Sequence, residues 1–342
     1  MKAAVWTGID KIEIQEVEMP TIGKEEALLK VRCAGVCVTD YHIISGKLKI
    51  GKCPNIQGHE ICAEVYKINT ERDDIKIGDR CVVATSLGCG HCDYCRQGKQ
   101  YLCKESSEIG YYPHNGGYAE YVKVPVSAIV KIPDTVSDLA GSILESCVCP
   151  TESLMNFGVP FNGNVLITGC GPAGLAYIMI SKIMGAKNVL VLVRGEDRVK
   201  RVLDFGADVA IDTQKDKDVA KKVLELTNGE GADLVIEATG AKDIISQTLI
   251  FVKKGGTIIQ YGIPGDDEVI TYPVKKLVVD EITIHGAVGN TKAWYPLVEL
   301  ISKGKFDIEK MVTHVFKLED INKAFDLYRN HDRTLIKAVI KF

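Results

Sequence analysis

Four cysteines crowd into one short stretch of the chain and have the spacing of a metal site. They form the pattern C-x2-C-x2-C-x7-C with Cys89, Cys92, Cys95 and Cys103. Four thiolates from a compact loop can close a tetrahedral Zn²⁺ shell and leave no open position for chemistry. The alternative is a loop of free or disulfide-bonded cysteines. At this spacing we predict a structural zinc.

A second group of possible ligands lies closer to the N-terminus. Cys37, Thr39 and His42 place a thiol, a hydroxyl and an imidazole within six positions, and His59 is followed directly by Glu60. A catalytic zinc needs about three protein ligands and one open position for water or substrate. A single Cys or His more often packs in the core or lies at the surface. Together with the four-cysteine run, however, Cys37 and His59 are predicted ligands of a catalytic zinc.

A glycine-rich turn follows an apolar run at 164–168 and precedes a helical stretch. The pattern G-x-G-x-x-G alone is a weak signal, but in this strand–turn–helix context it predicts dinucleotide binding. The glycines let the backbone approach the pyrophosphate, whose charge the helix N-terminus favours. The predicted cofactor-binding residues of the turn are Gly169, Gly171, Pro172, Ala173 and Gly174.

The end of the second predicted strand of this region bears on the choice between NAD and NADP. An NAD site usually has an acid there, which hydrogen-bonds the ribose hydroxyls. Here Val193 occupies the position and Arg194 follows it, with Arg198 further on. Guanidinium groups suit a 2′-phosphate, so NADP is the predicted cofactor. The alternative is that both arginines are solvated surface charges and that the cofactor is NAD. The predicted cofactor-binding set also includes Lys337 in the last strand.

Composition limits the class of protein. The 342 residues are long enough for two domains, and 46% hydrophobic with 25% charged residues is typical of a globular protein. A net charge of −3 argues against nucleic-acid binding. No signal peptide is apparent, and the uncharged run at 161–181 contains turn residues, so we expect no membrane span and a cytoplasmic location. In that compartment, the 12 cysteines favour metal binding over disulfides.

The elements that must position these residues change in type along the chain. Residues 1–150 are dense in short strands and turns, for example at 27–33 and 80–84. From residue 164, apolar strands alternate with helix-length connections, which implies a parallel sheet covered on both faces. A helix at 318–328 and a strand at 335–342 are expected near the end. The predicted strands of the alternating region are 164–168, 189–193, 209–211, 233–238, 257–261 and 282–286.

Taken together, the motifs G-V-C-x-T-D-x-H, G-H-E and C-x2-C-x2-C-x7-C resemble the zinc-containing medium-chain dehydrogenases, a family of alcohol, sorbitol, butanediol and threonine dehydrogenases. The resemblance runs the whole length of the chain. It implies an α/β protein with two domains. A GroES-like, β-rich catalytic domain of residues 1–150 and 291–342 would carry both zinc sites. Residues 151–290 would form a Rossmann domain, a doubly wound parallel sheet that binds the dinucleotide.

The resemblance also implies roles for individual residues. Cys37 and His59 would bind the catalytic zinc, with Glu60 beside the metal or bound to it in some states. Counting along the family pattern places the third ligand at Glu145, although Ser146 and Cys147 replace the Pro-Leu that follows the Glu in polyol dehydrogenases. Cys147 and Cys149 are competing ligands.

Other residues would move the proton or orient a ligand. By the same resemblance, Thr39 would hold the substrate hydroxyl, His42 would continue the proton relay, and Asp40 would orient His59. The implied reaction is reversible hydride transfer between NADP(H) and a polyol, sugar or secondary alcohol, in a homodimer or homotetramer with two zinc ions per chain.

Other functions remain open from the sequence. A quinone or enoyl reductase of the same superfold would lack zinc, and a silent relative would bind nucleotide without catalysis. An NAD-dependent polyol or threonine dehydrogenase is the alternative within the family. The specificity pocket is not assigned, but six residues are candidates for its lining: Cys53, Ile56, Tyr111, Cys147, Trp294 and Tyr295.

Overall fold

The computed structural model describes residues 1–265 and 267–342, which divide into two compact units. The first contains Met1–Val148 and Asn290–Phe342, and the second contains Cys149–Gly289. Each limit lies within two residues of the expected domain limits at 150 and 290.

The first unit is built mainly from antiparallel strands. A seven-stranded sheet has the order β10-β6-β5-β3-β18-β17, with β9 also paired to β3, and a smaller sheet has the order β2-β1-β4. The strands of the first unit are β1 (Lys2–Gly8), β2 (Lys11–Glu16), β3 (Glu26–Val36), β4 (Asn55–Ile56), β5 (Glu60–Asn69), β6 (Arg80–Val83), β7 (Ser86–Leu87), β8 (Ser107–Glu108), β9 (Tyr121–Pro125), β10 (Ile129–Lys131), β17 (Val312–Phe316) and β18 (Lys337–Lys341).

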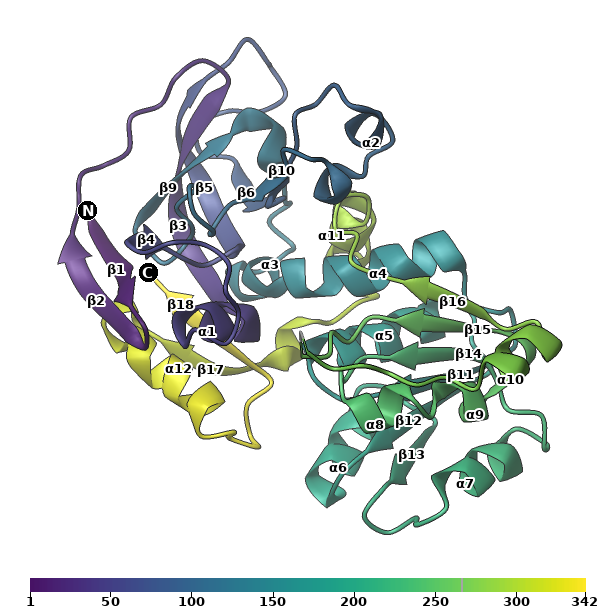
Figure 1. Ribbon diagram of the computed structural model, residues 1–342. Helices are drawn as coiled ribbons and strands as arrows, with labels where there is room; N and C mark the ends of the chain where they lie inside the picture. Colours follow the sequence, from purple (N-terminus) through teal and green to yellow (C-terminus); the bar gives the residue numbers. More distant parts are fainter. Residues whose placement is uncertain (266) are drawn as a thin grey trace. The chain divides into compact units, whose positions relative to one another are not determined.

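Short helices connect these strands. The C-terminal strands β17 and β18, yellow in Figure 1, lie in the same sheet as the purple β3, so the chain returns to its first unit at the end. β18 corresponds to the strand expected at 335–342. The helices are α1 (Val38–Ile44), α2 (Asp93–Arg96), α3 (Asp138–Ile143), α11 (Trp294–Ser302) and α12 (Ile321–Arg329), with 3₁₀ turns η1 (Gln100–Leu102), η2 (Val126–Ala128), η3 (Glu309–Met311) and η4 (Leu318–Asp320).

The second unit is a parallel sheet of six strands in the order β13-β12-β11-β14-β15-β16. This is the order of a doubly wound dinucleotide-binding sheet, with the reversal between β11 and β14. All six strands expected from the sequence are present: β11 (Asn164–Thr168), β12 (Asn188–Val193), β13 (Val209–Asp212), β14 (Ala232–Glu237), β15 (Val252–Gln260) and β16 (Thr283–Gly286).

Helices separate these parallel strands, as Figure 1 shows. They are α5 (Pro172–Ile183), α6 (Glu196–Asp204), α7 (Val219–Leu226), α8 (Lys242–Ile245), α9 (Thr248–Phe251) and α10 (Val274–Val279), while α4 (Glu145–Phe157) leads into the unit. The central strands are buried on both faces, since Val165, Leu166 and Ile167 have no exposed surface. Such strands carry continuous apolar runs, which explains why they could be found in the sequence.

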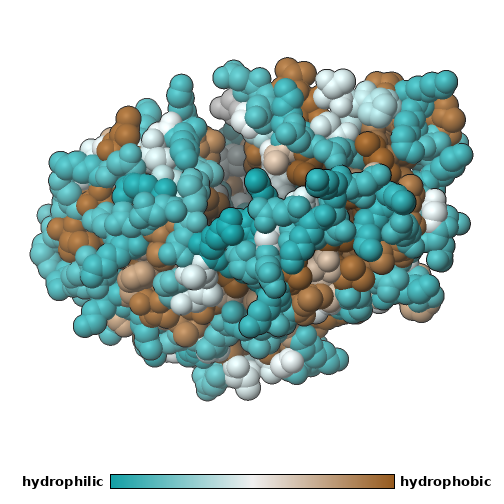
Figure 2. Space-filling model, turned by 90° about the horizontal axis from the view of Figure 1, so that it is seen from below, coloured by the Kyte–Doolittle hydropathy of each residue, from teal (hydrophilic) through white to brown (hydrophobic). Residues whose placement is uncertain are grey.

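Figure 2 shows one face on which hydrophilic residues predominate and hydrophobic residues lie in separate groups. Among the residues that the structure describes, no helix is both long and apolar enough to cross a membrane. The uncharged run at 161–181 is divided between β11 and α5.

Candidate active site

Pairing of β3 with β5 brings together the two N-terminal motifs. Cys37 directly follows β3 and caps the N-terminus of α1, where its sulfur accepts the Thr39 N–H at 3.5 Å. Glu60 begins β5 opposite Gly35, so His59 and Glu60 lie beside the end of β3. The ligand atoms of Cys37, His59 and Glu60 all lie within 4.8 Å of one another. This geometry can hold one metal ion.

The imidazole of His59 is held in one orientation. Its Nδ1 lies 3.1 Å from Asp40 Oδ1, and both side chains are buried. A proton on Nδ1 that is donated to this carboxylate leaves Nε2 free to bind a metal. Burial opposes a charge on His59, but the nearby groups of Tyr111, Asp40 and Cys37 outweigh it and raise the pKa of the ring well above its usual value. The same surroundings favour a metal cation.

Glu60 is buried and ion-paired from one side. Its Oε1 accepts a hydrogen bond from the Lys337 ammonium of β18, while Oε2 is buried without a hydrogen-bond partner. A Cβ on Gly35 would lie 2.1 Å from Oε2, so this approach requires glycine. An unpartnered buried carboxylate oxygen is costly, and a metal ion would satisfy it. The fit therefore favours a cation beside Glu60.

Glu145 lies next to the group of Cys37, His59 and Glu60 but is not one of its members. It begins α4, and its Oε2 is 3.9 Å from His59 Nε2. Two ligands of one tetrahedral zinc are about 3.3–3.6 Å apart, so a small movement would complete the shell. Burial raises the pKa of Glu145 to about 7, with Glu60 acting in the same direction and His59 opposing it.

The two expected relay residues lie on α1. Thr39 is in its first turn and half-buried, and His42 is in its last turn. Burial, followed by the charge of Lys47, lowers the pKa of His42, so the ring is neutral near pH 7 and can accept a proton.

The four-cysteine loop is compact. The sulfur atoms of all four cysteines lie within 4.8 Å of one another. Cys89 Sγ accepts the Cys92 N–H at 3.4 Å, and Cys103 Sγ accepts the Glu105 N–H at 3.3 Å. Hydrogen bonds from the backbone of Cys89 and Glu105 lower the pKa of Cys103 to about 7. Bonds of this kind stabilise thiolates, the form that binds zinc.

His91 and Glu105 also lie close to Cys89, as a third possible ligand group. Both side chains are exposed, and His91 Nδ1 is 2.9 Å from the Cys89 carbonyl oxygen. The four sulfurs already suffice for a closed shell. The geometry therefore gives His91 no separate role.

In the second unit, the glycine-rich turn joins β11 to α5. Gly169 has φ of +97°, Gly171 is the N-cap of α5, and Pro172 is its first residue. Ala173 and Gly174 complete the first turn. A Cβ on Gly174 would lie 2.5 Å from the Gly169 carbonyl oxygen, so the loop closes tightly on the helix. The free N–H groups of the helix start can receive a pyrophosphate.

The residues at the end of β12 bear on whether the cofactor carries a phosphate on its ribose 2′-oxygen, that is, on the choice between NAD and NADP. Val193 is buried, Arg194 is exposed and Arg198 is half-exposed on α6. Asp212, which the sequence analysis did not single out, lies beside Val193 at the end of β13. Its Oδ1 accepts the backbone N–H groups of Gly195 and Gln214 at 2.9 and 3.0 Å. Only the strand register reveals this acid.

Lys337 is buried within the first unit. It is 2% exposed, and its ammonium pairs with Glu60. Burial alone would lower the pKa of Lys337, but Glu60 and Cys37 outweigh it and raise it. A contact with the cofactor stays a prediction. The pairing with Glu60 has no local signal in the sequence, because the two residues are 277 positions apart.

The six residues proposed to line the specificity pocket differ in burial and in contact with the metal group. Tyr111 reaches the metal group, with Oη 3.3 Å from His59 Nδ1. Ile56, Cys147 and Trp294 are buried in the core. Cys53 and Tyr295 are exposed. Tyr111 is therefore the candidate with a direct contact to the site.

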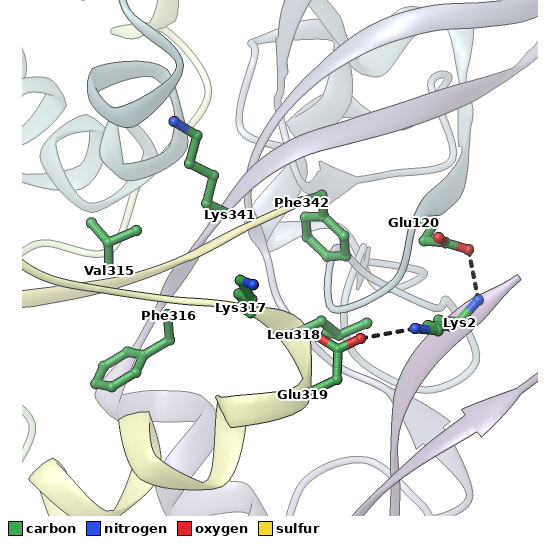
Figure 3. A pocket seen from close by; sticks show the side chains of 9 residues that line it. All are labelled: Lys2, Glu120, Val315, Phe316, Lys317, Leu318, Glu319, Lys341 and Phe342. Atoms are coloured by element: carbon green, nitrogen blue, oxygen red, sulfur yellow. Dashed lines mark hydrogen bonds and ion pairs between the residues drawn. The ribbon is translucent and has the colours of Figure 1, made fainter.

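A surface pocket of the first unit is drawn in Figure 3. Lys2 is engaged there, since its ammonium lies 3.0 Å from Glu319 and its N–H donates to Glu120 at 2.7 Å. No candidate ligand or relay residue is among the lining residues, which are Lys2, Glu120, Val315, Phe316, Lys317, Leu318, Glu319, Lys341 and Phe342. This pocket therefore does not include either candidate metal group.

Comparison with known proteins agrees with this arrangement. Residues 23–134 match the model of the alcohol dehydrogenase GroES-like domain, and residues 172–303 match that of the zinc-binding dehydrogenases. D-arabinitol dehydrogenase 1 of Uromyces fabae is 32% identical over 96% of this chain and 93% of its own. L-threonine 3-dehydrogenase of Bacillus subtilis strain 168 is 32% identical over 93% and 92%.

Solved structures show the same fold. An alcohol dehydrogenase from E. coli CFT073 in complex with NADH has a TM-score of 0.93 and 27% identity, covering 100% of this chain and 99% of that one. A zinc-binding dehydrogenase from Sinorhizobium meliloti 1021 bound to NADP has a TM-score of 0.91 and 25% identity at the same coverage. The chain therefore belongs to the zinc-containing medium-chain dehydrogenases, and it is an alcohol or polyol dehydrogenase.

Proposed function

We propose that the protein catalyses the reversible oxidation of a polyol, sugar or secondary alcohol with NADP, using one catalytic and one structural zinc ion per chain. The observation that carries this proposal is the buried group of Cys37, His59 and Glu60, whose ligand atoms lie within 4.8 Å of one another. Zinc bound there would act as a Lewis acid that lowers the pKa of the substrate hydroxyl.

The residues of the first unit would hold the metal and move the proton. Cys37 and His59 supply two ligands, and Glu145 is the proposed third, 3.9 Å from His59. Glu60 offers its unpartnered Oε2 as an alternative ligand. The hydroxyl proton would pass to Thr39 and then to the neutral ring of His42, both on α1. The four cysteines of the loop would hold the structural zinc.

The residues of the second unit would bind the dinucleotide. The turn at Gly169–Gly174 would receive the pyrophosphate at the start of α5. Val193 cannot accept hydrogen bonds from ribose hydroxyls, while Arg194 is exposed beside it and can pair with a 2′-phosphate. Arg198 would assist, and Lys337 stays a proposed contact.

An NAD-dependent dehydrogenase is the second candidate function. Asp212 places an acid next to Val193, although its Oδ1 already accepts two backbone N–H groups. Solved relatives bound to NADP and to NADH both resemble this chain. The missing acid at Val193 makes NADP the preferred proposal.

Substrate class rests on the chemistry around the metal group. Glu145 and the Tyr111 hydroxyl add polar groups beside His59, which suits a substrate with more than one hydroxyl. The relatives act on D-arabinitol or L-threonine, as their names state. We therefore place polyols first and threonine second.

One kinetic experiment tests substrate and cofactor together. The value of kcat/KM is measured for pentitols, hexitols, secondary alcohols and L-threonine, each with NADP and NAD. We expect a polyol with NADP to give the highest value. Arg194→Ala should then lower kcat/KM for NADP about 10–100-fold and leave the value for NAD unchanged, because a hydrogen bond to a charged group contributes about 1.5–3 kcal/mol. A clear preference for NAD would contradict the cofactor proposal.

We also propose that the protein is a homo-oligomer. β16 is an edge strand of its sheet, and Val278 and Val279 of α10 are 68% and 67% exposed. Exposed valines and an unpaired strand edge are each typical of an interface. Sedimentation velocity should show dimers or tetramers that Val278→Glu dissociates, and a monomeric wild-type protein would contradict this.

A cytoplasmic location is part of the proposal, since thiolate ligands need a reducing compartment.

A further inference from the structure

The hydroxyl of Tyr118 is buried next to the carboxylate that orients His59. Tyr118 is 1% exposed, and its Oη donates to Asp40 Oδ2 at 2.6 Å. The Gly35 carbonyl oxygen is further away, at 3.2 Å. Burial and the neighbouring Asp40 raise the pKa of the Tyr118 hydroxyl, so it keeps its proton and acts as the donor. The contact is a short, charge-assisted hydrogen bond.

Both oxygens of Asp40 are therefore occupied. Oδ2 accepts from Tyr118 and Oδ1 faces His59 Nδ1 at 3.1 Å, and Asp40 itself has no exposed surface. A carboxylate held at both oxygens cannot rotate without breaking one of the two bonds. The three side chains form a continuous buried chain from Tyr118 through Asp40 to His59.

This chain ends at the imidazole that faces the metal group. With its Nδ1 N–H donated to Asp40, His59 presents Nε2 toward Glu145. We propose that Tyr118 is a positioning residue for the catalytic zinc, which acts by fixing Asp40 and, through Asp40, the tautomer and tilt of His59. This inference rests on the proposed function, because it assumes that zinc binds at Cys37 and His59.

The ring of Tyr118 is fixed separately from its hydroxyl. A Cβ on Gly58 would lie 2.7 Å from Tyr118 Cδ1, so the ring packs directly on the backbone before His59. On another side it meets Phe325 edge to face, with ring centroids 6.1 Å apart. A phenylalanine would keep this packing and lose the hydroxyl alone. The substitution Tyr118→Phe therefore isolates the hydrogen bond.

The test is zinc affinity at each of the two sites, measured by competition with a chelator. In Tyr118→Phe, Asp40 Oδ2 loses its donor, and we expect the catalytic zinc to bind about 10–100-fold more weakly, as when other partners of metal ligands are removed. The zinc of the four-cysteine loop should keep its wild-type affinity. This readout does not depend on the activity of the loaded enzyme.

A matched control separates positioning from loss of stability. Tyr177 is also fully buried, and its hydroxyl makes one hydrogen bond, to Ser153 Oγ at 2.8 Å in the second unit. Tyr177→Phe removes a comparable buried bond and should leave both zinc affinities unchanged. Equal weakening of both sites in Tyr118→Phe would show general destabilisation and overturn the proposal. Unchanged catalytic-site affinity would overturn it as well.

A double-mutant cycle tests the route through Asp40. Asp40→Asn should weaken the catalytic zinc on its own, and adding Tyr118→Phe should then cost less than it does in the wild type. Additive effects would contradict an action through Asp40. A wild-type chain that binds zinc only at the four-cysteine loop would instead refute the proposed function, and with it this inference.

Discussion

At the scale of single residues, the first unit concentrates buried charge around the start of β5. Asp40, Glu60 and Lys337 are at most 2% exposed, and Glu145 is 9% exposed. A buried charge is tolerated when a partner or a metal ion compensates it. Lys337 compensates Glu60 from one side, and a metal ion would compensate it from the other. The pair thus has a structural role that does not depend on the cofactor.

Lys337→Met should reveal that role in stability. It leaves Glu60 buried without its ammonium partner, and breaking such a pair costs about 3–5 kcal/mol. Denaturant unfolding at pH 7 measures the loss. The double variant Lys337→Met/Glu60→Gln, which removes both charges, should recover most of the stability. A double variant as unstable as the single one would contradict this explanation.

At the scale of elements, the turn between β11 and α5 has two glycines with different functions. At Gly174 an added Cβ would meet the Gly169 carbonyl oxygen at 2.5 Å, whereas at Gly171 it would meet no atom within 4 Å. The first position is restricted by the protein itself. The second is open, where the expected pyrophosphate would approach the backbone.

Substitution by alanine should therefore have a different effect at each glycine, on stability at Gly174 and on cofactor binding at Gly171. Gly174→Ala forces the loop away from the helix, and overpacking of this kind costs about 1–3 kcal/mol. Gly171→Ala should keep wild-type stability and weaken NADPH binding. Thermal unfolding and NADPH fluorescence titration separate the two effects. Loss of stability in Gly171→Ala, or undisturbed binding by that variant, would argue against a pyrophosphate site here.

A second feature of this kind is the carboxylate at the start of α3, which forms ion pairs with two arginines. Asp138 lies 2.9 Å from Arg32 of β3 and 2.6 Å from Arg80 of β6. Burial would raise the pKa of Asp138, but the bonds from Arg32 and Arg80 outweigh it and lower the pKa. A lowered pKa in the folded state means that the stabilisation is complete above the unfolded value of about 3.9 and is lost as the pH falls through the folded value.

Asp138→Asn should thus destabilise the protein in a pH-dependent way. We expect a loss of about 1–2 kcal/mol at pH 7, since the pairs are partly exposed. The difference from wild type should be constant down to about pH 5 and shrink below about pH 4. Asp134→Asn is the control, because that side chain is fully exposed although it lies 3.8 Å from Arg80. A loss that does not depend on pH would contradict the ionic explanation.

Local patterns explain which elements could be predicted from the sequence. The strands β11 and β12 are continuous apolar runs, so their limits were found to within one residue. The strand expected at 257–261 begins earlier in the structure, at Val252. The prediction started too late because Gly255 and Gly256 interrupt the apolar pattern of β15. The helix expected at 318–328 starts with the 3₁₀ turn η4 before α12 begins at Ile321.

The candidate site could be predicted only where its residues are close in sequence or match a family motif. The four cysteines span one loop, and their spacing was sufficient. Tyr118 meets Asp40 across 78 positions, and Lys337 meets Glu60 across 277. The second contact depends on the pairing of β3 with both β5 and β18, whose register no local pattern specifies.

At the scale of the whole molecule, the chain divides its chemistry between two units. The first, closed by its own C-terminal strands, contains both candidate metal groups. The second contains the parallel sheet and the glycine-rich turn. Family membership and fold agree with a dehydrogenase built in this way. The proposed function requires the first unit to hold two zinc ions, a catalytic one at Cys37 and His59 and a structural one at the four cysteines.

The number of zinc ions bound by the purified wild-type chain and by Cys37→Ser distinguishes a catalytic zinc from a structural zinc alone. We predict two zinc ions per wild-type chain and one in Cys37→Ser. Dehydrogenase activity should fall together with the lost ion by about 10³-fold or more, because the Lewis acid contributes several kcal/mol to the transition state. One zinc ion in both proteins, or two in both, would contradict a catalytic zinc at Cys37.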